Sequence, residues 1–286
     1  MIYVVNHSGW GNRIKNIVSA LRTGHLTNDM IEIRFEYLDL FLVAQCIAEP
    51  RTDYTEVMST WGLLLLPDEH ERKILREPLR IMEYHDRNQI GYLENRLDYQ
   101  YFNIEPELVA EYLRYFALIR FRPEVLAAVD AWSNAWSIGD QIGVHVRTWF
   151  DAPDRFRTLY DIEDYFAVLD TYADTRQFVV CVDHDIARSA LIARYGRARI
   201  LEPANRAIGH IAIDPSRRVA FDSLVDMLLL ARCHSIVGTY QSTFTECAWW
   251  LGGARQAVQI PVPKAITALI AEFERAGKGG VMAGVA

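Results

Sequence analysis

Two polar residues, His145 and Arg147, stand two positions apart at the end of an apolar run and could bind a phosphate group. Side chains alternate along a strand, so these two share one face while their apolar neighbours take the other. A guanidinium suits phosphate because its planar fork makes two charge-assisted hydrogen bonds. Ligands bind at the carboxyl ends of strands in open α/β sheets, so the pair predicts an anion site. The alternative is an arginine paired with Asp151 or Asp154 and a histidine satisfied in the core.

A second group of donors lies where a later strand leads into a helix. Ser242, Thr243 and Thr245 supply hydroxyl groups, and Glu246 completes a pattern typical of a capping box. The free N–H groups at a helix start attract anions. The alternative is a well-capped helix with no ligand. With Arg147 expected on a neighbouring strand, a phosphate site is favoured.

The first strand leads into a glycine-containing segment, Gly9–Arg13, that precedes a helix. Glycine lets the backbone approach a ligand closely, and helix starts attract anions. The side chains of Asn12 and Arg13 add donors beside Gly11. The alternative is a tight strand-to-helix turn with an Asn cap, because the full GxGxxG pattern is absent.

Several carboxylates could also take part. Asp222 and Asp226 are four residues apart, which places them on one face of a helix where two bare charges would repel. Asp183–Asp185 resembles a metal-binding DxD, although a carboxylate at that position more often caps the next helix. The sequence holds no GxSxG elbow, no HExxH and no GxxxxGK[ST] loop, and we expect no metal site.

The elements that position these residues alternate between strand and helix, which is typical of an α/β protein with a doubly wound parallel sheet. The expected strands are Ile2–Val5, Ile31–Phe35, Ile142–Arg147, Gln177–Val182, Ala198–Leu201, Ser235–Thr239 and Gln256–Ile260. The expected helices are one after Gly11, one capped by Asp161, and Tyr37–Ile47, Glu105–Ile119, Pro123–Trp136, Asp185–Tyr195, Ala220–Arg232, Thr243–Leu251 and Pro263–Arg275. Periodicity is weak over residues 49–103.

A length of 286 residues favours two domains. We expect a smaller α/β lobe over residues 1–135, a larger doubly wound lobe over 136–276 and a disordered tail over 277–286. The two lobes would join near residues 121–140 with a cleft between them.

Composition excludes some classes of protein. A net charge of −7 argues against nucleic-acid binding, which needs a basic face. The apolar runs are too short to cross a membrane, and no signal peptide is recognisable. A peripheral contact with a membrane remains open. The four cysteines lie far apart, which indicates a reducing compartment and a cytoplasmic protein.

Taken together, the motifs resemble those of the two-lobed fucosyltransferase superfamily, which includes bacterial nodulation α-1,6-fucosyltransferases and protein O-fucosyltransferases. Gly9–Arg13 is similar to its N-terminal G-x-G-N loop, and His145–Arg147 is similar to its HxR motif. Asp226–Cys233 and Val237–Thr245 resemble its D-x-x-x-L-x-x-C and S-[ST]-F-[ST] pair. The resemblance implies two Rossmann-like lobes of the GT-B type, with residues 1–135 on the acceptor side and 136–276 binding the nucleotide sugar.

The resemblance implies GDP-fucose as the donor substrate, a glycan or other hydroxyl compound as the acceptor, and no cofactor. The residues it places around the diphosphate are Gly11, Asn12, Arg147, Ser242, Thr243 and Phe244. Asp226, or alternatively Asp222, would read the guanine edge, since a carboxylate accepts from both N1–H and the exocyclic amine.

It further implies transfer with inversion and without metal, because the guanidinium and the helix ends neutralise the leaving diphosphate. His145 and Arg147 are the expected catalytic residues. The sequence singles out no base for the acceptor hydroxyl, and His145, Asp151 and Glu32 are candidates. The family's HxR is followed by a short acidic or Gly-Asp segment, whereas Thr148 and Trp149 follow here.

Three other functions stay open. The first is a glycosyltransferase that uses another nucleotide sugar. The second is a non-catalytic protein of the same fold that binds a nucleotide or a glycan. The third is a structural α/β protein in which Arg147 is only ion-paired.

Overall fold

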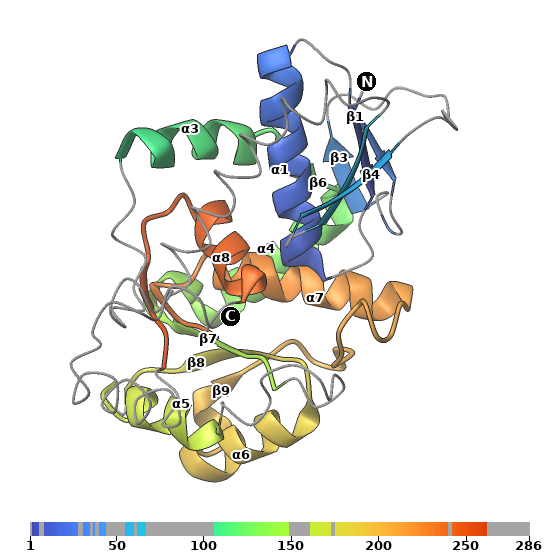
Figure 1. The fold of residues 1–286 in the computed structure, drawn as a ribbon. Coiled ribbons are helices and arrows are strands. Elements are labelled where there is room, and N and C mark those ends of the chain that lie inside the picture. Colours follow the sequence, from blue (N-terminus) through green and yellow to red (C-terminus); the bar gives the residue numbers. More distant parts are fainter. Residues whose placement is uncertain are drawn as a thin grey trace, which may run out of the picture.

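The computed structural model describes residues 2–5, 9–27, 31–34, 37, 40–43, 55–59, 62–66, 106–148, 161–172, 175–239 and 242–261. Within these residues strands and helices alternate and build two main sheets (Figure 1). The expected α/β class is therefore confirmed. The helix expected at Pro263–Arg275 and the tail expected at 277–286 lie outside the described residues.

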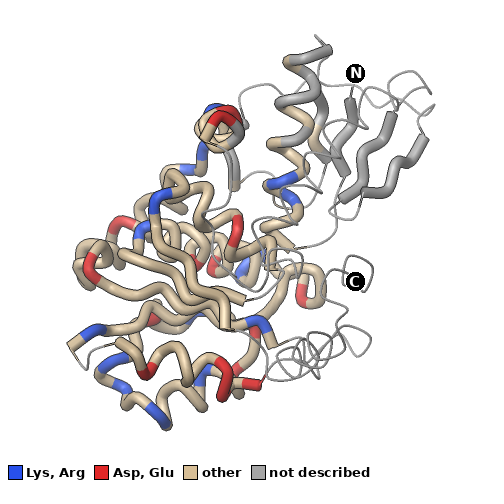
Figure 2. The backbone as a smooth tube through the Cα atoms, turned by 60° about the vertical axis from the view of Figure 1, so that its left-hand side comes forward, with Lys and Arg blue, Asp and Glu red and all other residues tan. Residues whose placement is uncertain are grey.

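The larger sheet has five parallel strands, which confirms the parallel sheet expected for the C-terminal half. In spatial order they are β11 (Ala257–Gln259), β10 (Ser235–Val237), β7 (Ile142–Val146), β8 (Phe178–Val182) and β9 (Ile200–Leu201). None of these strands contains a Lys, Arg, Asp or Glu, so their tubes are tan in Figure 2. Every residue of β7 and β8 is buried, as expected for strands covered on both faces.

Helices cover both faces of this sheet (Figure 1). One face carries α5 (Ile162–Leu169) and α6 (Asp185–Tyr195), and the other carries α7 (Arg217–Leu230) and α8 (Thr243–Leu251). A further helix, α4 (Pro123–Trp136), packs against α7. The sheet is thus doubly wound, and α7 and α8 lie beside the edge where polar residues were expected.

The alternation expected along β7 is confirmed. Val144 and Val146 belong to the apolar cluster beneath α5 and α6. Gly143 and His145 lie on the opposite face, where a Cβ on Gly143 would stand 2.8 Å from the side chain of Leu230 in α7. The missing side chain lets α7 pack close to the sheet.

Side-chain caps set the starts of α5 and α6. The carboxylate of Asp161 accepts from the backbone N–H of Glu163. The carboxylate of Asp164 accepts from the backbone N–H of Asp161, and the two bonds together form a capping box. The side chain of His184 accepts from the backbone N–H of Ile186 and starts α6. Both helices begin where the sequence places them.

The smaller sheet is mixed, with the spatial order β2-β1-β5-β4. Its strands are β1 (Ile2–Val5), β2 (Ile31–Arg34), β4 (Thr55–Ser59) and β5 (Gly62–Leu66). β1 and β2 are parallel and joined by α1 (Trp10–Thr27), whereas β5 runs antiparallel to both β1 and β4. The two strands expected first in the sequence are confirmed, and β4 and β5 were not expected.

The helix expected at Tyr37–Ile47 is wrong. Phe41–Val43 instead forms a strand, β3, that pairs antiparallel with β6 (Ile119–Phe121). The preceding helix α3 (Pro106–Phe116) ends before β6, so the helix expected to reach Ile119 is shorter. Pairing between segments far apart in the chain decides these strands, because strand propensity depends on what the strand packs against.

The first helix joins the core of the second half. Trp10, Ile14 and Ile17 of α1 belong to one buried apolar cluster with residues of α3, α4, α7 and α8. The expected boundary near residue 135 stays a prediction. No helix within the described ranges is long and apolar enough to cross a membrane.

Candidate anion-binding site at the carboxyl edge of the parallel sheet

Arg147 follows β7 directly and lies opposite the residue that follows β8. Val146 pairs with Val182 in the parallel register, so Arg147 and Asp183 leave the sheet side by side. The guanidinium of Arg147 donates to the carboxylate of Asp183, which also accepts at 2.9 Å from both the backbone and the hydroxyl of Thr148. An ion-paired arginine was one of the two expectations, but its partner comes from the neighbouring strand. Asp151 and Asp154 lie outside the described residues.

His145 is buried and contacts two residues of α8. Its Nδ1 lies 2.8 Å from the hydroxyl of Thr245, and its ring stacks on Phe244 at 4.7 Å between centroids. The Thr245 hydroxyl accepts at 3.2 Å from the backbone N–H of Thr239, which leaves its own proton for His145. Burial lowers the pKa of His145 to about 3, and Arg147 adds to this shift. A neutral imidazole with so low a pKa is a weak proton acceptor, which favours a positioning role.

This low pKa predicts how stability depends on pH. An unfolded imidazole gains its proton near pH 6.5 and the folded one only near pH 3, so the unfolded state binds more protons between these values. The contribution of His145 is therefore complete above pH 6.5 and is lost as the pH falls toward 3. Between these two pH values, we expect His145 to lower the free energy of unfolding by up to about 1.4 kcal/mol for each pH unit that the pH falls.

Urea denaturation of the wild type and of His145→Asn from pH 4.5 to 7.5 measures this difference. The variant is needed because a second group also titrates in this range. Burial raises the pKa of Asp226 to about 6, although Arg206 lowers it. Asp226 therefore makes the free energy of unfolding change with pH in the direction opposite to that of His145. The wild type should lose stability toward low pH faster than the variant. Parallel profiles would mean that the folded imidazole takes up a proton as readily as the unfolded one.

The start of α8 lies beside these residues. Ser242 is its N-cap residue and makes no side-chain capping bond, so the first-turn N–H groups receive no side-chain oxygen from it. The expected capping box is wrong, because Glu246 is fully buried and accepts instead from Lys15 Nζ at 2.7 Å and from Trp250 Nε1 at 3.3 Å. An uncapped helix start is better suited to an anion than the capped one that was expected.

The start of α1 meets the start of α8. The helix begins at Trp10, two residues before the first position after the expected turn, so Gly11 lies within its first turn. A Cβ on Gly11 would stand 2.3 Å from the backbone of Thr243, and one on Gly9 would stand 2.6 Å from the ring of His210. At Gly11 the neighbouring atoms are backbone, so only glycine permits that approach. The two helix starts are therefore in contact.

The two polar residues after Gly11 differ in their surroundings. Asn12 is half-buried, and its Oδ1 atom is buried without a hydrogen-bond partner in the described part of the chain. The guanidinium of Arg13 is buried and lies 5.3 Å from the centre of the Trp10 ring. Asn12 thus keeps an unused acceptor near the contact between α1 and α8, while Arg13 packs within its own helix.

Asp222 and Asp226 are both buried on α7, and each has an arginine partner that the helix pattern did not assign. Asp222 Oδ2 accepts from Arg218 Nε at 2.5 Å and from the backbone N–H of Ala207 at 2.7 Å. Asp226 is ion-paired with Arg206. The expected repulsion between the two carboxylates is offset by these guanidinium groups.

Sequence reasoning missed Arg206 and His210, which come from the segment between β9 and α7. Both act electrostatically on His145 together with Arg147, so all three residues lie near the same strand end. The segment has no helical or strand period that could have indicated this position. Arg218 could have been found, since it lies four residues before Asp222 on the same helix.

The DxD-like segment has a structural role. Asp183 binds Arg147, His184 caps α6, and Asp185 pairs with Arg188 at 3.1 Å. The described ranges contain no group of three or more His, Cys, Asp or Glu residues that could hold a metal ion. The side chain of Glu32 lies outside the described residues.

Comparisons with known proteins give similarity at the level of structure only. No family model matches the chain, and no curated protein does. The fucosyltransferase NodZ from Bradyrhizobium is 16% identical with a TM-score of 0.45, over 84% of this chain and 88% of that one. A mutant of Arabidopsis thaliana FUT1 in complex with GDP is 14% identical with a TM-score of 0.47, over 90% and 69%. POFUT1 in complex with GDP is 12% identical with a TM-score of 0.49, over 90% and 98%.

Proposed function

We propose that this chain is a glycosyltransferase of the GT-B type that binds a nucleoside-diphosphate sugar at the carboxyl edge of its parallel sheet. The proposed donor is GDP-fucose, as the motifs Gly9–Arg13, His145–Arg147 and Asp226–Cys233 suggest by their resemblance to the fucosyltransferase superfamily. The proposed acceptor is a hydroxyl group of a glycan or similar compound.

One observation carries the proposal: the starts of two helices meet at the tip of β7. Gly11 of α1 touches the backbone of Thr243 in α8, while Phe244 of α8 stacks on His145 of β7. Each helix start carries about half a positive charge, and Arg147, which follows β7 directly, adds a full positive charge. Backbone N–H groups at helix starts and a guanidinium are both groups that bind phosphate.

In the proposed reaction the bond between the sugar and the diphosphate breaks, and negative charge grows on the leaving phosphate. Arg147 and the helix N–H groups stabilise that charge, which is usually the largest contribution to such catalysis. His145 stays neutral and fixes Phe244 and Thr245 at the start of α8. Asp183 orients the guanidinium of Arg147 through their ion pair.

The proposed transfer inverts the sugar carbon and uses no resident metal, because cationic groups of the protein neutralise the diphosphate. A base must accept the proton of the attacking hydroxyl in such a step. The low pKa of His145 makes it the weakest of the three candidates, which leaves Asp151 and Glu32.

Thermal denaturation with added nucleotides tests the proposal. A ligand that binds only the folded state raises the free energy of unfolding by RT ln(1 + [L]/Kd), about 2.7 kcal/mol at 100 times its Kd. We expect GDP to raise the melting temperature clearly and UDP and ADP to raise it little.

The other outcomes separate the alternatives. A response to UDP in place of GDP would indicate a different nucleotide sugar. The ion pair between Arg147 and Asp183 is the observation that favours a protein without activity. No response to any nucleotide would support that structural role, and GDP binding without sugar transfer across a broad acceptor panel would support a binding protein.

A further inference from the structure

The hydroxyl of Thr239 takes the place of a strand residue at the end of β7. The pairing of β7 with β10 ends at Val144 and Val237, so the C=O of His145 and the N–H of Arg147 lie beyond it. Thr239 Oγ1 donates to that C=O at 2.9 Å and accepts from that N–H at 2.9 Å. One side-chain oxygen thus supplies both the donor and the acceptor that these buried backbone groups need.

The phenol of Tyr165 completes the hydrogen bonds of this hydroxyl. A threonine hydroxyl has one proton and two lone pairs. In Thr239 the proton goes to His145 and one lone pair accepts from Arg147, so Tyr165, whose oxygen lies 2.7 Å away, donates to the other lone pair. Burial raises the pKa of Tyr165, which keeps the phenol protonated as a donor. All three hydrogen bonds that the Thr239 hydroxyl can make are therefore present.

This group of bonds is buried and connects both faces of the sheet. Thr239 is 0% exposed and Tyr165 is 1% exposed, so water is not at hand to replace a lost bond. Tyr165 comes from α5 on one face. The backbone N–H of Thr239 donates to Thr245 of α8 on the other face, and Thr245 in turn contacts His145.

Arg147 is therefore held at both ends. Asp183 binds its guanidinium, while Thr239 binds its backbone N–H. Position matters for a group that stabilises a developing charge, because a displacement of about 1 Å can slow a reaction about 100-fold. We propose that Thr239 and Tyr165 are positioning residues for sugar transfer, which act on the reaction by fixing the backbone of Arg147. This inference rests on the proposed function.

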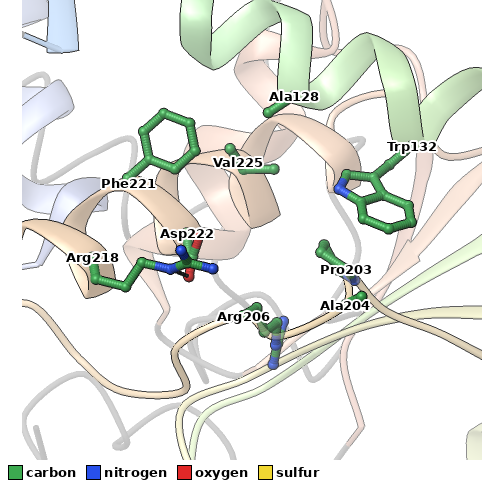
Figure 3. A pocket seen from close by; sticks show the side chains of 9 residues that line it. All are labelled: Ala128, Trp132, Pro203, Ala204, Arg206, Arg218, Phe221, Asp222 and Val225. Atoms are coloured by element: carbon green, nitrogen blue, oxygen red, sulfur yellow. Dashed lines mark hydrogen bonds and ion pairs between the residues drawn. The ribbon is translucent and has the colours of Figure 1, made fainter.

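The network is separate from a cavity of about 170 Å³ that lies between α4, α7 and the segment that follows β9 (Figure 3). The side chains around that cavity, among them Trp132 and Phe221, include neither Thr239 nor Tyr165. Substitutions in the network leave the lining of the cavity unchanged, so their effects can be assigned to the strand end.

Thr239→Val is the main test, because valine has the shape of threonine and the backbone bond to Thr245 remains. The rate of GDP release from GDP-fucose should fall about 10- to 100-fold in kcat. KM for GDP-fucose should stay nearly unchanged, the pattern expected when an interaction of the transition state is lost. Thr239→Ser keeps the hydroxyl and should recover most of the rate. Titration with GDP counts the binding sites, so that each rate is expressed per folded molecule.

Tyr165→Phe is a milder variant, because the bonds of Thr239 to the strand remain. It should lower kcat about 2- to 10-fold, as for the loss of one neutral hydrogen bond. Tyr195→Phe is its matched control, since the Tyr195 hydroxyl donates instead to the exposed Asp170 at 2.9 Å. This control should match the wild type.

A double variant tests whether Thr239 acts through Arg147. Arg147→Lys has already lost the paired hydrogen bonds that depend on the position of the guanidinium. Adding Thr239→Val to Arg147→Lys should therefore slow the reaction much less than it slows the wild type. Two effects that simply multiply would show that Thr239 acts independently of Arg147 and would overturn the inference.

The remaining outcomes separate this inference from the function on which it rests. A wild type that releases no GDP from GDP-fucose overturns both. An active wild type with an equally active Thr239→Val overturns the positioning role alone. If Thr239→Val does not fold, Tyr165→Phe decides: a rate below that of Tyr195→Phe supports the role, and an equal rate overturns it.

Discussion

Arg147→Lys should slow sugar transfer roughly 100- to 1,000-fold, the usual effect of removing one preorganised donor to a developing negative charge. It should also weaken GDP binding about 10-fold, because a lysine keeps the charge but cannot form the paired hydrogen bonds of a guanidinium. The retained charge still faces Asp183, so the fold should survive. Steady-state kinetics with GDP-fucose and titration with GDP measure the two effects.

Arg194→Lys is the matched control. Arg194 is paired with Asp170, but both side chains are more than 40% exposed and the pair lies on α6 and the end of α5. Exposed ion pairs contribute little, so this variant should match the wild type in both measurements. GDP affinity unchanged in Arg147→Lys would remove Arg147 from the binding site.

The candidate site could be predicted in part because its signals are local. Alternation along β7 fixed the side of the sheet that carries His145, and the parallel register brought Arg147 to the edge. In the sequence, the starts of α1 and α8 each follow a strand directly. In α/β folds such helix starts lie near the carboxyl ends of the strands, where ligands bind. Gly11 and Thr243, which the resemblance places around the same diphosphate, are in contact.

The rest depends on contacts between distant segments. The strand at Phe41–Val43 exists because it pairs with Ile119–Phe121, and a local helical period gave no sign of that partner. Glu246 fits a capping box by spacing, yet its carboxylate is taken by Lys15 from the other end of the chain. Arg206 lies in an irregular segment, so only the folded chain reveals its contact with Asp226.

The contact between Lys15 and Glu246 gives the largest expected effect on stability. Both side chains are buried, at 4% and 0% exposure, and their 2.7 Å ion pair joins α1 to α8. Removing one partner leaves the other charge buried, which typically costs 3–5 kcal/mol. We expect Lys15→Met to lower the free energy of unfolding by about that amount, as measured by urea denaturation.

The reference for this effect is an exposed pair. Arg232 lies 2.6 Å from Asp130, with side chains 37% and 57% exposed. Arg232→Met should therefore change the free energy of unfolding by less than about 1 kcal/mol. An effect of Lys15→Met equally small would show that water reaches the charges between α1 and α8.

The double variant Lys15→Met/Glu246→Leu separates packing from charge. With both charges removed, apolar side chains of similar size fill the same space, so most of the lost stability should return. The starts of α1 and α8 would still meet through Gly11, and GDP binding should return with the fold. A double variant that is stable but binds GDP poorly would show that the ion pair sets the orientation of the two helix starts as well as holding them together.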